Sequence, residues 1–145
     1  MLDEQIITTN LRLKGFKVTN ARTRIIQIFE TYHVISAPEI ITLIKSDRLS
    51  IHKSTVYREI DFLLRQNIIR QLEFRERDKK YELVSKRHHH HLICISCKKV
   101  IEFELEEDWS VQEQKVSKEK NFQVLDHSLE FFGLCVECKK SESAS

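Results

Sequence analysis

The sequence predicts an α+β fold in two parts: a helical N-terminal part that ends in a β-hairpin, and a mixed C-terminal part built around cysteine pairs. Three observations support this: apolar residues at helical spacing in the first half, a charged turn between two strand-forming segments, and the location of all four cysteines in the second half. A chain of 145 residues allows one domain or two small ones. With 41% apolar and 32% charged residues, it can bury a core.

The first half contains several helix signals in succession. Residues 3–14 carry apolar side chains at helical spacing and end at Gly15, and Thr19 or Asn20 can cap a second helix. The Ser-Ala-Pro-Glu sequence at 36–39 is typical of a helix start, with serine as N-cap, proline in the first turn and glutamate at the third position. We expect that helix to run to about residue 46.

The next segment combines a strong helix with a hairpin. Residues 52–66 place apolar side chains at i, i+4, i+7 and i+8, and Asn67 suits the left-handed position that follows a helix. Strand-forming residues at 68–74 and 79–84 flank a charged Arg-Glu-Arg-Asp turn. Three helices followed by such a hairpin is the order of a winged helix-turn-helix, with 52–66 as the recognition helix.

The predicted recognition helix begins with residues suited to nucleic acid. Ser54, Thr55, Tyr57 and Arg58 are types that hydrogen-bond phosphates and base edges, and a tyrosine ring can contact thymine methyls. An ordinary solvated helix face is the alternative. Residues 1–84 hold 15 basic against 11 acidic residues, a net +4, and residues 85–145 hold 9 against 11, a net −2. This mild asymmetry agrees with nucleic-acid binding but does not establish it.

The second half is organised around its cysteines. Apolar strand segments within 92–105 flank the first pair, residues 108–120 predict a helix, and 122–134 predict one or two strands before the second pair. The 37 residues between the pairs therefore predict a βαβ-like excursion. We expect no regular structure from Lys139 onward. The predicted organisation is a DNA-binding domain at 1–84, a hinge at 85–87 and a metal-binding domain at 88–145.

Two kinds of metal ligand are concentrated in this half. The pairs Cys94/Cys97 and Cys135/Cys138 supply four thiolates at the spacing of a tetrahedral structural zinc site. Two disulfides or reactive thiols are the alternatives, and the absence of a secretory signal argues against disulfides. A structural zinc ion would add folding free energy to a small domain.

A run of four histidines, residues 88–91, leads into the first cysteine pair. In extended backbone, His89 and His91 would face one side, and His88 and His90 the other. Imidazole and carboxylate together suit Fe, Mn, Zn, Ni or Co. Glu82 and Glu102 are the nearest carboxylates in the sequence, and His127 is a further candidate ligand.

These features together resemble the ferric uptake regulator (Fur) family of metal-dependent repressors. The likeness covers nearly the whole chain in order, and the histidine–cysteine block is its most specific part. The residues that carry it are Gly-Phe-Lys-Val-Thr at 15–19 with Arg22, Ser-Ala-Pro-Glu at 36–39, Ser-Thr-Val-Tyr-Arg at 54–58, Tyr-Glu-Leu at 81–83, the block 88–103, His-Ser-Leu at 127–129 and Gly-Leu-Cys-Val-Glu-Cys at 133–138.

The resemblance implies a cytoplasmic homodimer that binds an AT-rich palindromic operator, with a winged helix followed by a small α/β dimerisation domain. It implies Zn²⁺ on the four cysteines and a regulatory Fe²⁺ or Mn²⁺ at the domain hinge. The implied regulatory ligands are Glu82, His89, His91, Glu102 and a loop histidine, here His33. An additional site would use His88, His90 and His127. The implied DNA contacts are Lys17, Arg22, Ser54, Thr55, Tyr57 and Arg58.

Three positions depart from the family pattern. His33 precedes Ser36 by three residues instead of two, and Val34 stands in the usual place. Ser110 occupies the position at which the additional site usually has a carboxylate, although residues 106–108 are acidic. Lys98 replaces the glycine that commonly follows the first cysteine pair.

Several alternatives remain open from the sequence. Iron sensing is favoured because both regulatory carboxylates are glutamates, whereas peroxide-sensing relatives carry aspartates. Zinc-sensing and nickel-sensing relatives are the other options within the family. A zinc-stapled interaction protein that does not bind DNA belongs to a different class. An enzyme is not expected, since no hydrolytic zinc motif occurs and four thiolates close their site. No membrane span and no small-molecule substrate are expected.

Overall fold

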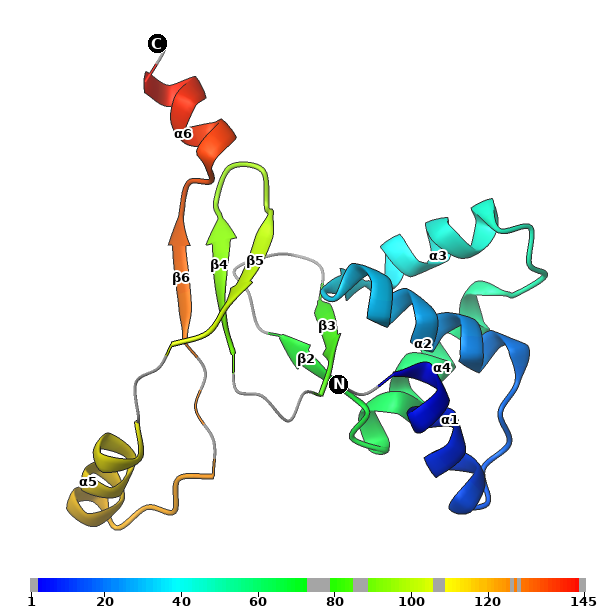
Figure 1. The fold of residues 1–145 in the computed structure, drawn as a ribbon, viewed down its shortest axis with the longest axis horizontal. Coiled ribbons are helices and arrows are strands. Elements are labelled where there is room, and N and C mark those ends of the chain that lie inside the picture. The colour runs from blue at the N-terminus through cyan, green and yellow to red at the C-terminus, as the bar shows by residue number, and fades with distance from the viewer. Residues whose placement is uncertain are drawn as a thin grey trace. The chain divides into compact units, whose positions relative to one another are not determined.

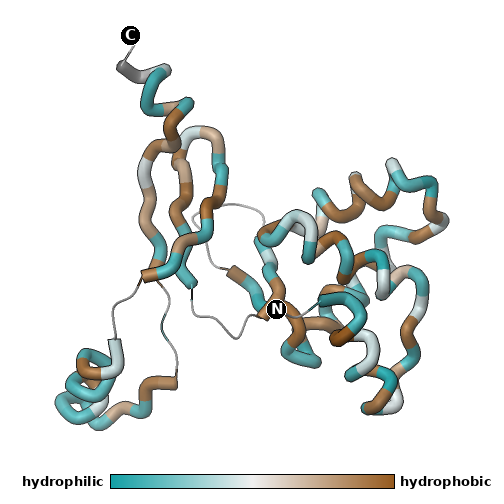
Figure 2. The backbone as a smooth tube through the Cα atoms, in the orientation of Figure 1, coloured by the Kyte–Doolittle hydropathy of each residue, from teal (hydrophilic) through white to brown (hydrophobic). Residues whose placement is uncertain are grey.

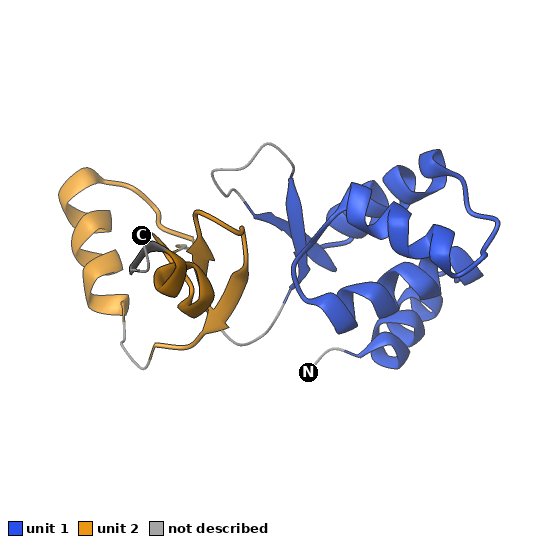
Figure 3. Cartoon of the chain, turned by 90° about the horizontal axis from the view of Figure 1, so that it is seen from above, with its two compact units in different colours: residues 1–86 blue, residues 87–145 orange. Residues whose placement is uncertain are grey.

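A computed structural model describes residues 3–72, 79–84, 89–105, 109–125, 127 and 129–143. The chain divides into two compact units, residues 1–86 and 87–145 (Figure 3). Among the described residues, hydrophobic stretches occur in the helices of the first unit and in the sheet of the second, whereas helix α5 is mainly hydrophilic (Figure 2). No described helix has both the length and the apolar character that a membrane crossing needs.

The first unit is a winged helix-turn-helix domain (Figure 1). Its described elements are, in order, α1 (Glu4–Leu13), α2 (Asn20–Tyr32), β1 (Ile35–Ser36), α3 (Ala37–Ser46), α4 (Lys53–Arg65), β2 (Ile69–Leu72) and β3 (Lys80–Leu83). Strand β3 pairs antiparallel with β2 on one side and with β1 on the other. The hairpin and the helices agree with the sequence prediction. The two-residue strand β1 is too short for periodicity to reveal.

Local sequence explains where these helices begin and end. Thr19 caps α2 by accepting the amide of Arg22 at 3.1 Å. Ser36 and Glu39 form the predicted capping box, with the Ser36 amide donating to Glu39 Oε2 at 2.9 Å. Asn67 follows α4 with a φ of 57°, the left-handed conformation predicted for it. These caps define where α2 and α3 begin and where α4 ends.

A single apolar core holds the first unit together. Helices α2, α3 and α4 turn their apolar faces inward, and α1 and the sheet complete the enclosure. The fully buried side chains include Phe29, Ile40 and Leu63. Burial of each such side chain contributes about 1.5–3 kcal/mol relative to exposure. The residues left outside on α4 are therefore held on a rigid support.

The second unit contains a sheet in which β4 (His90–Cys94) lies between β5 (Val100–Phe103) and β6 (Glu130–Gly133) (Figure 1). Strand β4 is antiparallel to β5 and parallel to β6. Helix α5 (Ser110–Lys120) lies between β5 and β6 in sequence, so the predicted βαβ-like excursion is present. Among residues 122–125, 127 and 129–134, only those of β6 form a strand, which is shorter than predicted.

The expectation of no regular structure from Lys139 onward was wrong. Helix α6 runs from Val136 to Ser143, and the Lys139 amide donates to the Cys135 carbonyl at 2.8 Å. The second cysteine pair therefore spans the start of a helix, and this helix continues through the polar residues that follow. Apolar periodicity cannot reveal such a helix, because its sequence is almost entirely polar.

Candidate metal centres and nucleic-acid interface

The four cysteines lie together at one end of the second unit. Their Sγ atoms are within 4.8 Å of one another, although Cys94 ends β4, Cys97 lies in the turn after it, Cys135 precedes α6 and Cys138 lies in its first turn. All four are free thiols, and the Sγ atoms of Cys97 and Cys135 are 3.6 Å apart. This arrangement fits a tetrahedral metal site with four sulfur ligands. It gives no support to the predicted alternative of two disulfides.

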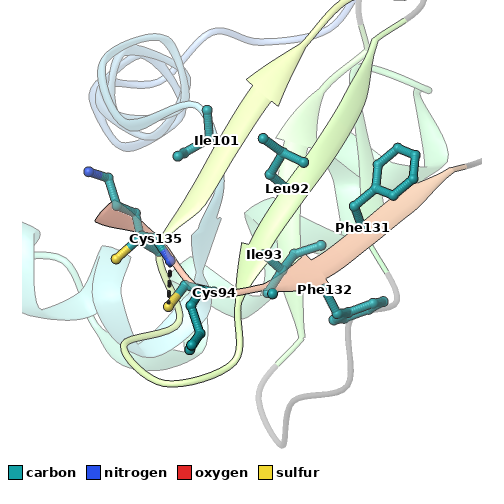
Figure 4. Close-up of a pocket in the computed structure, with 10 residues that line it drawn as sticks. Leu92, Ile93, Cys94, Ile101, Phe131, Phe132 and Cys135 are labelled. Carbon is teal, nitrogen blue, oxygen red and sulfur yellow. Dashed lines mark hydrogen bonds between the residues drawn. The ribbon is translucent and has the colours of Figure 1, made fainter. Parts of the chain in front are cut away.

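Electrostatics within this cluster distinguish the thiols. The backbone N–H of Cys135 donates to Cys94 Sγ at 3.4 Å (Figure 4) and, with further backbone hydrogen bonds, lowers the pKa of Cys94 to about 6. The backbone N–H of Cys138 lowers the pKa of Cys135, but burial and the surrounding thiol and carboxylate groups outweigh it and raise that pKa to about 12. Cys94 thus ionises more readily than Cys135, and a bound cation would stabilise thiolates that lie so close together.

A small cavity of about 150 Å³ adjoins this cluster (Figure 4). Cys94 and Cys135 line it on one side, and the remaining lining is mainly apolar: Leu92, Ile93, Ile101, Phe131, Phe132 and Leu134, together with Lys99 and Gly133. The apolar surroundings disfavour uncompensated charge, which again favours thiolates neutralised by a metal over free thiolates.

The turn between β4 and β5 shows how the cysteine cluster accommodates Lys98. Its φ is 68°, the left-handed region that glycine adopts without penalty, and its amide donates to the Cys94 carbonyl at 3.0 Å. The Lys98 ammonium also donates to the Ile95 carbonyl at 3.0 Å. The turn geometry expected for a glycine is therefore kept with a lysine in its place.

A second group of donors lies on the other side of β4. The side-chain donor atoms of His89, His91 and Glu102 are within 4.8 Å of one another, and the two imidazole rings have centroids 4.9 Å apart. His91 and Glu102 are directly opposite each other in the β4–β5 ladder. Two imidazoles and a carboxylate match the ligand preference of Fe, Mn, Zn, Ni or Co.

The remaining predicted regulatory ligands belong to the first unit. Glu82 lies in β3, where its carboxylate pairs with Arg70 on β2; Arg70 Nε is 2.7 Å from Glu82 Oε1. His33 is exposed at the C-cap of α2. It does not belong to either cluster of donor atoms found among the described residues. The predicted hinge, residues 85–87, lies outside the described residues.

The additional-site histidines are brought close to one another and to an unexpected carboxylate. His90 and His127 have stacked rings with centroids 5.9 Å apart, and Glu113 Oε1 is 2.5 Å from His127 Nδ1. Ser110 occupies the position at which the family pattern has a carboxylate, and Glu113 lies one helical turn further along α5. The i, i+3 relation along a helix could have revealed it. His88 lies outside the described residues, as do the acidic residues 106–108.

Four of the six predicted DNA-contacting residues are exposed in the first unit. On α4, Ser54, Tyr57 and Arg58 are exposed at helical spacing, whereas Val56, on another face, is buried, and Thr55 is half-buried. Lys17 is exposed in the segment before α2. Burial raises the pKa of Tyr81 on β3, and the neighbouring Tyr57 raises it further.

Arg22 differs from the other predicted contacts, since its guanidinium is already engaged. It pairs with Glu59 of α4 and donates to the Lys17 carbonyl, and both ion-pair side chains are only 12% exposed. Glu59 escaped the sequence analysis because a single glutamate in an amphipathic helix carries no signal of a specific partner.

A helix-turn-helix domain joined to a metal-ligating domain defines the class of metal-dependent transcription regulators. The ferric uptake regulator family model matches residues 13–132, and the chain belongs to that family. The ferric uptake regulation protein of Synechococcus elongatus is 32% identical over 139 residues, which is 93% of this chain and 94% of that protein.

Solved structures give the same result. The ferric uptake regulator of Helicobacter pylori, described as having three functional metal binding sites, aligns with a TM-score of 0.75 and 29% identity over 95% of this chain and 92% of that one. A zinc-bound manganese uptake regulator aligns with a TM-score of 0.67 and 31% identity over 86% of this chain and 95% of that one. The chain is accordingly a DNA-binding, metal-binding regulator of transcription.

Proposed function

We propose that this protein represses transcription as a homodimer that binds an AT-rich palindromic operator when a regulatory divalent metal is bound. The observation that carries the proposal is the convergence of His89, His91 and Glu102 in a chain whose other unit presents a recognition helix. Fe²⁺ is the proposed regulatory metal and Mn²⁺ the next choice. The similarity to ferric and manganese uptake regulators supports that order. Zn²⁺ is the proposed occupant of the cysteine cluster.

The mechanism depends on ligands contributed by both units. We propose that Glu82, at the end of the winged helix, completes the site of His89, His91 and Glu102, with His33 as a further ligand. A metal that binds all of these groups at once favours the arrangements in which the two units are close together, so it selects among the positions of the recognition helices. Glu82 would exchange its partner Arg70 for the metal on binding.

Dimerisation has a candidate surface in the second unit. Leu92, Ile101 and Phe131 occupy directly paired positions on β4, β5 and β6, so they form one row across the sheet. Their exposed fractions are 38%, 41% and 48%, which is high for three adjacent apolar side chains. We propose that a second copy of the chain covers this row, and that the two recognition helices then read the two halves of the palindrome.

The first experiment is an anisotropy titration of an AT-rich palindromic duplex with EDTA-treated protein, run anaerobically with Fe(II), Mn(II), Ni(II) or Zn(II). Tight binding that appears only with Fe(II) or Mn(II) supports the proposal. A response restricted to Ni(II) or Zn(II) would assign the protein to another sensor type, and peroxide sensitivity of the Fe(II) form would indicate a peroxide sensor. His89→Ala should abolish the metal response without unfolding the protein.

The alternative from a different class is a zinc-stapled interaction protein. It predicts no binding to any duplex under any metal condition at moderate salt. The proposal also implies a cytoplasmic protein without catalytic activity or small-molecule substrate. Its target is operator DNA, and the side chains of its two sites serve as metal ligands.

A further inference from the structure

Arg22, at the start of α2, makes an unusual set of contacts for a residue on a DNA-binding surface. Its Nε is 2.7 Å from Glu59 Oε2 and its Nη2 is 3.1 Å from Glu59 Oε1, so the ion pair is bidentate. Its Nη1 donates to the backbone carbonyl of Lys17 at 2.6 Å. Bidentate pairing adds geometric specificity to the attraction between charges.

Aromatic rings complete these surroundings. The Arg22 guanidinium carbon lies 3.7 Å from the centroid of the Phe62 ring, a cation–π contact, and Phe62 packs edge-on against Phe16 with ring centroids 5.2 Å apart. Glu59 and Phe62 belong to α4, whereas Phe16 and Lys17 belong to the segment before α2. One side chain therefore joins the recognition helix to the segment that carries Lys17.

We propose that Arg22 is a positioning residue: its clamp on Glu59 and the Lys17 carbonyl fixes the distance between Lys17 and the α4 residues Tyr57 and Arg58. This inference rests on the proposed operator binding and replaces the predicted direct contact of Arg22 with DNA. A guanidinium with three N–H groups engaged and one face on an aromatic ring has little capacity left for phosphate or bases.

The spacing matters because the two elements approach DNA at separate places. A base or phosphate contact contributes fully only when the protein group and its DNA partner are aligned, and the loss of one contact lowers affinity by about five- to 150-fold. Without the clamp, Lys17 and α4 would each still bind phosphate, but not at a fixed separation. Specific binding should fall, while non-specific binding, which depends on charge, should change little.

Glu59→Gln provides the decisive test, because positioning and simple electrostatics predict opposite signs. Removing a negative charge from a DNA-binding domain should by itself tighten binding to polyanionic DNA. The clamp predicts instead that operator affinity weakens by at least about tenfold. The matched control is Asp61→Asn, since Asp61 is exposed on the same helix and pairs only with Arg65 among the described residues for which a partner is given. Its operator affinity should stay unchanged or rise.

Anisotropy with operator and with unrelated duplex, at several salt concentrations, measures both affinities for each variant. Arg22→Gln and Glu59→Gln should lose the same factor, and the double variant should lose no more than either, because one clamp is removed in all three. Unchanged or tighter operator binding by Glu59→Gln would overturn the proposal. So would a steeper loss with Arg22→Gln accompanied by a salt slope reduced by about one, which is the mark of a direct phosphate contact.

A stability-only role is separated by replacing the pair with apolar residues. Arg22→Met combined with Glu59→Leu should melt close to the wild type, since apolar replacements of buried ion pairs are often neutral or stabilising. The proposal expects this variant to bind the operator as weakly as Glu59→Gln despite its intact fold. Restored operator affinity would contradict the clamp. If the wild-type protein binds no duplex, the proposed function itself fails, an outcome distinct from any difference between variants.

Discussion

Glu113 lies 2.5 Å from His127, and this contact joins helix α5 to the loop that precedes β6. The His127 ring also stacks on that of His90, so a carboxylate and two imidazoles gather on the side of β4 opposite to His91. We therefore propose Glu113, one turn further along α5 than Ser110, as the carboxylate of the additional site.

This relationship predicts the effect of Glu113→Gln. If His90, His127 and Glu113 bind an additional divalent metal, the variant should lose that equivalent with an affinity drop of at least about tenfold. Isothermal titration of zinc-loaded protein with Mn(II) measures the number of remaining equivalents. Ser110→Ala serves as the control and should leave that number unchanged. An unaltered additional equivalent in Glu113→Gln would place the ligand elsewhere.

The recognition helix gives a second prediction. Arg58→Ala should weaken operator binding by about 1–3 kcal/mol, because Arg58 is exposed on the face of α4 proposed to read the major groove. Fluorescence anisotropy with the metal-loaded protein measures the loss. Arg65→Ala removes an equally charged residue from the other end of the helix and should have a much smaller effect. Equal losses in the two variants would argue for a general charge effect.

A third prediction concerns self-association. Phe131→Glu should shift the protein toward monomer by at least about tenfold in dissociation constant, because it places a charge within the exposed apolar row of the sheet. Sedimentation equilibrium at several concentrations gives the constant. Leu125→Glu is the control, since Leu125 is 85% exposed and lies outside the sheet. A stable Phe131→Glu dimer would exclude this row as the interface.

Zinc retention should depend on pH and on Cys94. Because backbone hydrogen bonds hold the pKa of Cys94 near 6, its thiolate competes well with protons at neutral pH. Zn²⁺ must also displace protons from the other thiols, including that of Cys135 with its raised pKa, so the zinc content should decline as the pH falls below 7. Cys94→Ser should release zinc at pH 7, as measured with a chromogenic chelator, whereas Ser96→Ala should retain it. Full zinc content in Cys94→Ser would show that the other three thiols suffice.

Glu39 makes the stability of the first unit pH-dependent. Burial raises its pKa, but the Ser36 amide and the Lys80 ammonium outweigh that effect and leave the pKa below its usual value of 4.5. A carboxyl with a lowered folded pKa stabilises the protein above its unfolded pKa, and this contribution is lost as the pH falls through the folded value.

Glu39→Gln should therefore lower the melting temperature slightly at pH 7, by about 0.5 kcal/mol or less, because glutamine can still accept the Ser36 amide and only the half-exposed ion pair with Lys80 is lost; the difference should shrink at pH values below about 4. Thermal melts of the two proteins at both pH values measure it. Glu119→Gln, an exposed glutamate of α5, is the control. A difference that persists undiminished in acid would mean that the charge of Glu39 contributes nothing.

The sequence could predict those features that depend on local order. The capping box at Ser36, the left-handed residue Asn67 and the hairpin each depend on a few adjacent residues, and the structure has all three. The proximity of the cysteine pairs also followed from spacing, because four thiols in so small a unit have few other arrangements. Helix α4 is evident from its amphipathic period alone.

Features that depend on tertiary pairing could not be predicted in this way. Strand β1 exists only because Ile35 pairs with Tyr81, some 46 residues away, and Glu59 is meaningful only once Arg22 lies beside it. Glu113 contacts His127 because helix α5 directs its side chain toward that ring, and the separation of the two residues in the sequence does not show this. Helix α6 has no apolar stripe, so its sequence did not indicate regular structure.

Strand β4 sends alternate side chains to opposite faces: Leu92, in the exposed apolar row, lies on one, and His91, among the metal-ligating donors, on the other. It ends at Cys94 of the thiol cluster. A substitution in β4 can therefore alter the apolar row, the histidine donors or the thiol cluster separately, whereas a change in the length of β4 alters all three. Deleting or inserting one residue would exchange the two faces and shift Cys94 out of place at once. A single-residue change in the length of β4 should therefore do more damage than any one substitution within it.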